Sequence, residues 1–219
     1  GMVLLKIGDL DLAIDYIRRG LELSEQRGDT VGPLYDRINL AYALTVQGRF
    51  EAAEELAVDG LAVAERMHHA YLIAGLSAAA GDAVFRKGAL DLAEAHALRS
   101  LLQEEEYFRP WALTVLGLVQ GARSQQSGVV QTAAQTLNMA ADAARAIDDD
   151  YGEAYALHAL GEVYARNHRY EMAEEVWKQA LHIYTTLGFQ LEAQRTAERI
   201  GELGLAEEQP AGAPRHTRV

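Results

Sequence analysis

Residues 155–184 read YALHALGEVYARNHRYEMAEEVWKQALHIY, and they contain two helical patterns separated by a polar break. Before the break, apolar residues recur at steps of three and four, at Leu157, Leu160, Val163 and Tyr164. After the polar segment 167–169 the same spacing resumes, at Ala173, Trp177, Ala180 and Tyr184. Such steps place side chains on one face of an α-helix. The segment therefore predicts two amphipathic helices joined by a tight turn.

The same arrangement recurs along the chain with a period of 40 residues. One column of the repeat is occupied by Ala13, Ala53, Ala93, Ala133 and Ala173. Two further columns hold small residues, twelve positions before each alanine and seven positions after it: Gly1, Ala41, Gly81, Gly121 and Gly161, and Gly20, Gly60, Ser100, Ala140 and Ala180. Small side chains allow helices to cross closely. Each unit is therefore predicted to be a pair of packed helices, and the units are predicted to stack into a solenoid.

The sequence also predicts where some helices begin and end. Gly28 and Gly188 are expected to end helices in a left-handed conformation. Pro33 and Pro110 suit first helical turns, and a capping box is predicted to begin at Asp150.

The columns resemble the tetratricopeptide repeat family in their pattern of glycine, alanine and aromatic residues. The match is nearly complete in one unit, at Leu160, Gly161, Tyr164, Tyr170, Ala173, Trp177, Ala180 and Leu181. It is also good at Leu40, Ala41, Gly48, Phe50, Ala53, Gly60 and Leu61. The period of 40 residues is longer than the ~34 residues usual for the family. With the segment 182–189, this longer unit resembles the repeat arms of large bacterial signalling ATPases and transcriptional activators.

The resemblance implies an all-α fold, a right-handed α–α superhelix of about five helix-turn-helix units. We expect one solenoid over residues 1–205 and a flexible tail over 206–219. A capping helix is predicted over residues 190–204, because apolar residues recur on one face at Phe189, Ala193, Ala197, Ile200 and Leu203. Gly1 already occupies the eighth position of a unit, which indicates either a fragment of a longer array or a shortened first helix.

Composition argues against several classes of partner. The formal net charge is −12 and the basic residues are scattered singly, so neither a direct nucleic-acid partner nor an anionic membrane surface is expected. The chain has no cysteine, which excludes disulfides and thiol catalysis and suits a reducing compartment. The apolar run 70–81 is shorter than the roughly 20 residues of a membrane span. Without a secretory signal, the predicted location is the cytoplasm.

Candidate catalytic and metal-binding motifs are few. Ser77 lies in a Gly-Leu-Ser-Ala-Ala sequence that resembles a nucleophile elbow but lacks its second glycine. His158 and Glu162 share a helix face, yet they supply too few ligands for a metal, and we interpret them as a polar pair lining a groove. The acidic runs 104–106 and 148–150 are interpreted as helix ends and solvated faces. The sequence thus predicts no enzyme, no cofactor and no metal.

The concave surface of the superhelix is the candidate site, because in this family the first helix of each unit faces it. The inward positions predict a ligand-binding groove formed by Tyr35, Ile38, Tyr42, Asp82, Phe85, Arg86, Gln125, Tyr155, His158, Glu162 and Arg166. Aromatic rings and charged side chains are typical of the energetic centres of interfaces. The competing interpretation is that the tyrosines only fill the groove of a tightly wound superhelix.

The predicted function is a non-catalytic module that binds a protein or peptide in this groove. The resemblance further implies that the module is a sensor or docking arm of a bacterial regulatory or signalling system. Transcription regulation is one role that such a system could have. Chaperone C-terminal carboxylates are not expected to bind, because Ile38, Tyr42 and Ala79 stand where such a clamp needs lysine and asparagine. Arg86 and Arg166 occupy equivalent positions two units apart as isolated cations, which favours an acidic peptide with apolar anchors.

A second hypothesis is a homo-oligomeric structural scaffold. In this interpretation Tyr107, Phe108 and Trp111 form a self-association patch, which would support a homodimer. The two hypotheses differ in their partner, which is another protein in the first and a second copy of this chain in the second.

Overall fold

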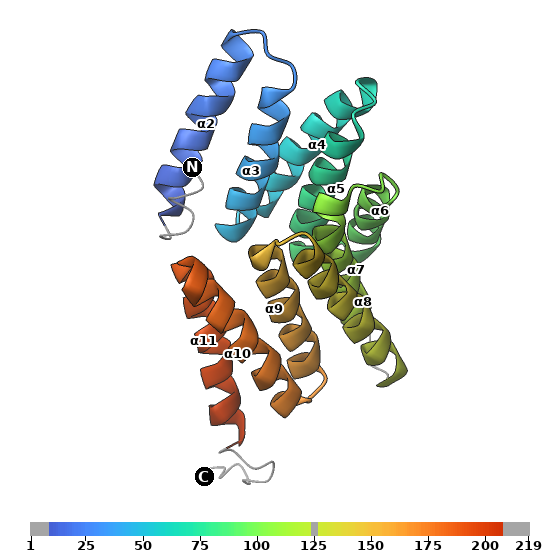
Figure 1. The fold of residues 1–219 in the computed structure, drawn as a ribbon, viewed down its shortest axis with the longest axis vertical. Helices are drawn as coiled ribbons and strands as arrows, with labels where there is room; N and C mark the ends of the chain where they lie inside the picture. The colour runs from blue at the N-terminus through green and yellow to red at the C-terminus, as the bar shows by residue number, and fades with distance from the viewer. Residues whose placement is uncertain (1–8, 124–126, 208–219) are drawn as a thin grey trace, which may run out of the picture.

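The structure, a computed structural model, describes the backbone of residues 9–123 and 127–207 and the side chains of residues 9–123 and 130–203. These residues form ten α-helices and one short 3-10 helix, and none of them lies in a β-strand. The elements are α2 (Leu10–Gln26), α3 (Gly32–Val46), α4 (Phe50–Arg66), α5 (Ala70–Arg86), α6 (Leu90–Leu101), η1 (Glu106–Phe108), α7 (Arg109–Arg123), α8 (Ser127–Ala146), α9 (Asp150–Arg166), α10 (Tyr170–Leu187) and α11 (Gln190–Glu207). The predicted fold class, an all-α solenoid of helix pairs with a C-terminal capping helix, is confirmed (Figure 1).

Each helix packs against the next along the chain, so the array is built from helical hairpins. The complete units are α3–α4, α5–α6, α7–α8 and α9–α10, and α2 supplies the second helix of the unit before them. The first helices of neighbouring units also contact one another, α3 with α5, α5 with α7 and α7 with α9. These first helices therefore form one continuous layer, and the stacked units are visible in Figure 1.

The columns of small residues mark the helix crossings, as predicted. All five alanines of the period-40 column are fully buried. A Cβ atom added at Gly161 would lie 2.3 Å from Nε1 of Trp177 in the partner helix of the same unit. A Cβ atom added at Gly121 would lie 2.5 Å from Cγ2 of Val163 in the next unit. Glycine thus makes room for large side chains both within a unit and between units.

The turns between helices follow a period of 20 residues. Left-handed backbone conformations occur at Gly28, Gly48, His68, Gly88, Asp148, His168 and Gly188, and also at Glu104. The sequence-based prediction that Gly28 and Gly188 end helices in this conformation is confirmed, with φ angles of 70° and 81°. A residue of this kind allows the last carbonyl groups of a helix to be satisfied before the chain reverses.

Helix starts agree with the predictions in two cases and differ in one. Pro33 and Pro110 both lie in first helical turns, where the missing N–H group costs nothing. The predicted capping box beginning at Asp150 is wrong by one residue. Asp149 is the cap of α9, because its carboxylate accepts a hydrogen bond of 2.9 Å from the backbone N–H of Gly152. Glu153 instead accepts a hydrogen bond of 2.7 Å from Arg145 in α8.

The C-terminal helix α11 spans Gln190–Glu207, whereas we expected a capping helix over 190–204, and it packs against α10. Its buried face includes Phe189 just before the helix and Ile200 and Leu203 within it. Ala197, which we expected on this face, is exposed, whereas Thr196 is fully buried. Residues 208–219, most of the predicted flexible tail, lie outside the described residues.

The array curls far enough for its early and late helices to touch. In Figure 1 the C-terminal end of α3 lies next to the starts of α9 and α11. The hydroxyl of Tyr42 in α3 is hydrogen-bonded to the hydroxyl of Tyr151 in α9 and donates to Glu192 Oε1 in α11 at 3.0 Å. Arg195 of α11 donates to the backbone carbonyl of Val46 at 3.1 Å. These contacts join residues that are 109 to 150 positions apart in the sequence.

Candidate functional site

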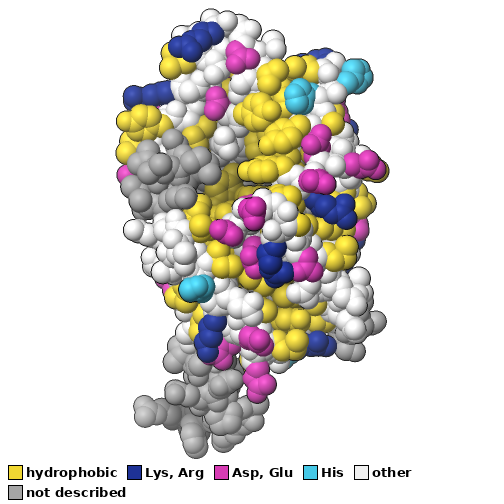
Figure 2. All heavy atoms as spheres, viewed as in Figure 1, with side chains coloured by type: hydrophobic (Ala, Val, Ile, Leu, Met, Phe, Trp, Pro, Cys, Tyr) yellow, Lys and Arg dark blue, Asp and Glu magenta, His cyan; other side chains and the backbone are white. Residues whose placement is uncertain are grey.

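Two adjoining pockets lie on the inner surface formed by the first helices of the units. We call them the apolar pocket, which includes Ile38, Ala79, Tyr107, Phe108 and Trp111, and the polar pocket, which includes Gln47, Arg86, His158, Glu162 and Glu192. They hold about 850 Å³ and 1300 Å³ of empty space, open mouths included. Both are also lined by Tyr42, Thr45, Asp82 and Tyr151, so they form one groove. Figure 2 shows a hollow bordered by hydrophobic side chains above a group of acidic and basic ones.

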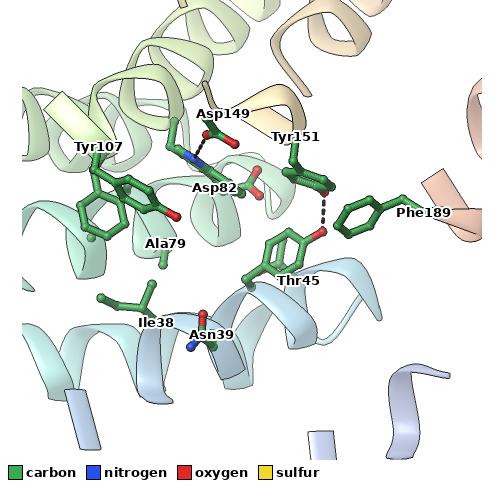
Figure 3. Close-up of a pocket in the computed structure, with 14 residues that line it drawn as sticks. Ile38, Asn39, Thr45, Ala79, Asp82, Tyr107, Asp149, Tyr151 and Phe189 are labelled. Carbon is green, nitrogen blue, oxygen red and sulfur yellow. Dashed lines mark hydrogen bonds between the residues drawn. The ribbon is translucent and has the colours of Figure 1, made fainter. Parts of the chain in front are cut away.

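The apolar pocket exists because η1 and small residues shape its walls. Phe108 of η1 is buried against Gly75 of α5, where an added Cβ atom would lie 2.6 Å from Cζ of Phe108. The same Cβ atom would lie 2.7 Å from Cδ1 of Ile38. Figure 3 shows Tyr107 and Ile38 at one end of this pocket and Phe189 at the other. Gly75 thus leaves the room that lets the Phe108 ring of η1 pack against α5 and form one wall of the apolar pocket.

Trp111 organises the aromatic wall of the apolar pocket. Its ring stacks on Tyr151 with centroids 5.7 Å apart and meets the edge of Tyr42 at 5.8 Å. The indole Nε1 donates to Asp149 Oδ2 at 3.2 Å, so the carboxylate that caps α9 also fixes the indole (Figure 3). Phe189 closes the cluster, with its ring centroid 4.5 Å from that of Tyr151. Rings from α3, α7, α9 and the start of α11 therefore meet in one place.

The polar pocket contains an ion pair between first helices. Arg86 Nε lies 3.3 Å from Asp82 Oδ1 one turn earlier in α5. Its Nη2 donates to the hydroxyl of Tyr155 in α9 at 3.4 Å. Burial, and secondarily the charge of Asp82, raise the pKa of Tyr155, so this hydroxyl stays protonated. The contacts link two first helices that are two units apart.

A second polar group surrounds Glu162 of α9. Oε1 of Glu162 lies 3.6 Å from Nε2 of His158, and Oε2 lies 3.3 Å from Nη2 of Arg166. Burial raises the pKa of Glu162, but His158, Arg86 and Arg166 lower it more, to about 2. The other ring nitrogen of His158 pairs with the Thr196 hydroxyl at 2.9 Å. His158 and Glu162 both line the polar pocket. Among the described residues, no group of three or more His, Asp or Glu side chains could hold a metal ion.

Glu192 lies where the early and late helices meet. Burial, and then the charge of Glu192, raise the pKa of Tyr42 well above its ordinary value, so its hydroxyl is a permanent donor. The Tyr151 hydroxyl lies 3.5 Å from the same oxygen, and because Tyr42 donates to Glu192, Tyr151 donates its single proton to Tyr42. The second oxygen, Oε2, is buried and accepts no hydrogen bond from any described residue. The same is true of Gln47 Oε1, which lines the same pocket.

The structure brings most of the predicted site residues together. Six of them line the polar pocket, namely Tyr42, Asp82, Arg86, Tyr155, His158 and Glu162, and Ile38 lines the apolar pocket. Tyr35 lies outside both pockets and packs against Tyr71 with ring centroids 5.7 Å apart. Gln125 lies outside the described residues.

Two of the predicted groove residues are placed differently from expectation. Phe85 is buried in the core with only 7% of its surface exposed, so it does not face the groove. Arg166 lines neither pocket and is half exposed. The prediction that Arg86 and Arg166 are isolated cations is wrong, because Asp82 and Glu162 neutralise them at 3.3 Å.

The proposed self-association patch is also not formed as expected. Phe108 is buried and Trp111 is enclosed by other rings, which leaves Tyr107 as the only strongly exposed member of the three. All three instead line the apolar pocket. The remaining motifs are structural, since Ser77 is fully buried within α5 and Asp149 of the acidic run 148–150 caps a helix.

Sequence reasoning missed Gln47, Glu192 and Phe189 as groove residues. They lie at a helix end or in the capping helix, outside the inward columns of the repeat. The only signal that could have found them is the polar Glu192 close to apolar Phe189 and Ala193. Among the described residues, no helix is long and apolar enough to cross a membrane.

Comparisons with known proteins agree with this architecture. A family model described as Tetratricopeptide repeat matches residues 37–68 and 154–187, and a second model with the same description matches residues 1–27. A search of curated proteins gives no match. The fold resembles a Rap protein complexed with Competence and Sporulation Factor, with a TM-score of 0.59, 16% identity and 95% of this chain covered. The chain spans only 63% of that protein. It also resembles BtubC (BKLC) from P. vanneervenii, with a TM-score of 0.54, 16% identity and 96% of each chain covered.

Proposed function

Because the chain belongs to the tetratricopeptide repeat family, whose folds serve as protein-interaction modules, we propose that it binds a peptide segment of a partner protein in the groove formed by the two pockets. The observation that carries this proposal is the apolar pocket. Its aromatic side chains line a hollow that is open to solvent, so they do not fill the groove completely. A solvent-accessible apolar hollow with polar groups beside it is the usual form of a binding site.

The packing of the groove suits a non-catalytic role. Asp82 and Arg86 neutralise each other, and the carboxylate of Glu162 is paired with His158 and Arg166. Such groups position one another, and no nucleophile with an adjacent base stands among them. The groove therefore offers shape and hydrogen bonds for recognition.

We further propose that the module acts in the cytoplasm as a sensor or docking arm of a bacterial regulatory or signalling system. The support is the resemblance of its long repeat unit to such arms and the fold likeness to a Rap protein that is complexed with a factor. The absence of cysteine suits a reducing compartment. A role in transcription regulation belongs to the same proposal.

Site-specific photo-crosslinking tests the location of binding. A benzophenone amino acid replaces Tyr107 in the apolar pocket or, as a matched control, Tyr16 of α2, which lines neither pocket. The two side chains are equally accessible, 53% and 54% exposed. In an extract of the source cells, we expect a crosslinked partner peptide at position 107 only. We also expect Ala79→Phe, which fills the apolar pocket, to abolish that adduct. Crosslinking of the same partner at position 16, or an adduct that survives Ala79→Phe, would place binding outside the groove.

A further inference from the structure

We propose that the groove selects a peptide segment in which an aromatic or aliphatic side chain stands close to a lysine or arginine. The inference rests on the proposed function and specifies the chemistry of its partner. It replaces the acidic peptide expected from the sequence, because Arg86 and Arg166 are both neutralised within the protein.

The first observation is a pair of unsatisfied acceptors in the polar pocket. Gln47 Oε1 and Glu192 Oε2 are buried, and neither receives a hydrogen bond from a described residue. Both residues line the polar pocket. A buried acceptor without a donor costs free energy, most of all on a charged group. The missing interaction is therefore a hydrogen-bond donor, and a positively charged donor would form the strongest bond with the Glu192 carboxylate.

The second observation is the balance of charge around these acceptors. The polar pocket is lined by five carboxylates and three guanidinium groups, the carboxylates being those of Asp82, Glu162, Glu192, Glu198 and Glu202. The guanidinium groups are already engaged: Arg86 with Asp82, Arg199 with Glu202 at 3.0 Å, and Arg195 with a backbone carbonyl. An acidic side chain would meet carboxylates whose cations are occupied. A basic side chain would meet a carboxylate oxygen that lacks a donor.

The third observation concerns the neighbouring apolar pocket. Its described lining contains two carboxylates, Asp82 and Asp149, and no lysine or arginine. Its walls, from Ile38 to Trp111, are apolar and aromatic, so they accept an aromatic or aliphatic anchor. Because the two pockets share Tyr42 and Asp82, the anchor and the basic group must lie close together on the same segment. Long-range attraction assists such a segment, since the protein carries a net charge of −12.

The test uses the full chain and three synthetic peptide pools of equal length. Each pool has random Gly, Ser and Thr flanks around a defined core: an apolar residue with Lys or Arg, an apolar residue with Asp or Glu, or Ser with Lys or Arg. Binding is measured by fluorescence anisotropy. We expect the apolar–basic pool to bind about tenfold more tightly than either other pool, and its affinity to fall as salt is added.

Two variants then localise the effect. Glu192→Gln keeps an acceptor for Tyr42 but removes the charge, and we expect it to weaken the apolar–basic pool about tenfold. The matched control is Glu202→Gln, which removes a charge from the same pocket at a 63% exposed side chain paired with Arg199, and we expect little change. Circular dichroism checks that both variants remain folded.

The outcomes separate this inference from the proposed function. Equal or tighter binding of the apolar–acidic pool, with loss on Ala79→Phe, would overturn the basic specificity and leave the peptide-binding groove standing. Equal binding by the Ser–basic pool would show nonspecific attraction to an acidic protein and would also overturn it. Binding of the apolar–basic pool that is unaffected by Glu192→Gln would overturn the role of Glu192. No binding by any pool at millimolar concentration would overturn both proposals.

Discussion

In the turns between helices, the left-handed position is not always occupied by glycine. Gly48 and Gly88 adopt left-handed conformations with φ angles of 84° and 83°, at no steric cost. His68 stands in the same column between them, and its φ angle of 52° places a side chain in a region that L-residues disfavour. The hydrogen bonds of this turn are nevertheless formed, because the N–H groups of His68 and His69 donate to backbone carbonyls of α4.

His68→Gly is expected to stabilise the protein by about 0.5–1 kcal/mol, because it removes the left-handed strain at an exposed position. The reciprocal change, Gly88→His, should cost about 1–2 kcal/mol, since no atom lies within 4 Å of the site of its Cβ to add packing. Urea unfolding measures both. A loss of stability in His68→Gly would mean that the histidine contributes an interaction which outweighs the strain.

The Glu162 carboxylate links stability to pH. Its pKa is about 2 in the folded protein and near 4.5 when unperturbed, chiefly because the hydrogen bond and charge of His158 outweigh the effect of burial. The folded state therefore holds its proton less tightly than the unfolded state. The stabilisation is complete above pH 4.5 and is lost as the pH falls from about 4.5 to about 2.

Comparing the wild type with Glu162→Gln isolates this contribution. We expect the difference in unfolding free energy between them to shrink by about 2–3 kcal/mol as the pH falls through that window. Glu202→Gln, at an exposed side chain, is the control and should show a small change. A difference that stays constant from pH 5 to pH 2 would contradict the assigned shift.

At the scale of the elements, the repeat phase can be tested at the crossing of α5 and α6. Ala93 is fully buried, and its carbonyl oxygen lies 3.5 Å from the position that a Cβ atom on Gly81 would take. Ala93→Leu should therefore cost about 1–3 kcal/mol through overpacking. Arg99→Leu, in the same helix with a 45% exposed side chain, removes only an exposed pair with Glu65 and should cost less than about 1 kcal/mol. Equal falls in melting temperature for the two variants would show that the period-40 alanine column does not lie at the helix crossing.

The elements were predictable because their signals are local and repeated. The buried alanines, Gly28 and Gly188 all carry information within one turn of helix, and the period of 40 residues multiplies it. The cap of α9 was misplaced because Asp149 and Asp150 are adjacent and both suit the position. Phe85 was misplaced because an inward column does not specify how far a large side chain turns towards the neighbouring helix.

The groove was only half predictable, since part of it depends on contacts between distant units. The inward columns predicted Tyr42, Asp82 and Tyr155, and these three residues line the polar pocket. They could not find Glu192, because α11 follows the last repeat and its place depends on how far the array curls. Nor could they show that η1, the one 3-10 helix among the described residues, places Phe108 against the apolar pocket.

Across the array, the contacts of α3 with α9 and α11 determine the shape of the groove. In an open solenoid each repeat contacts only its neighbours, and stability is a sum of nearest-neighbour terms. Here Tyr42 bonds to both Tyr151 and Glu192, so the early and late helices stabilise each other directly. The same residues line the pockets. The contacts that close the array therefore also shape the groove.

A double-mutant cycle tests this closure. Tyr42→Phe removes the donor, and Glu192→Ala removes the acceptor, of a hydrogen bond between residues 150 positions apart. Because the groups are in contact, the two losses of stability should be non-additive, with a coupling free energy of about 1 kcal/mol from urea unfolding. The control cycle pairs Tyr42→Phe with Glu202→Ala in α11, where the carboxylate bonds to Arg199 instead, and should give a coupling near zero. Additive losses in both cycles would mean that the helices do not meet in solution, and that the groove is an open channel between independently folded ends.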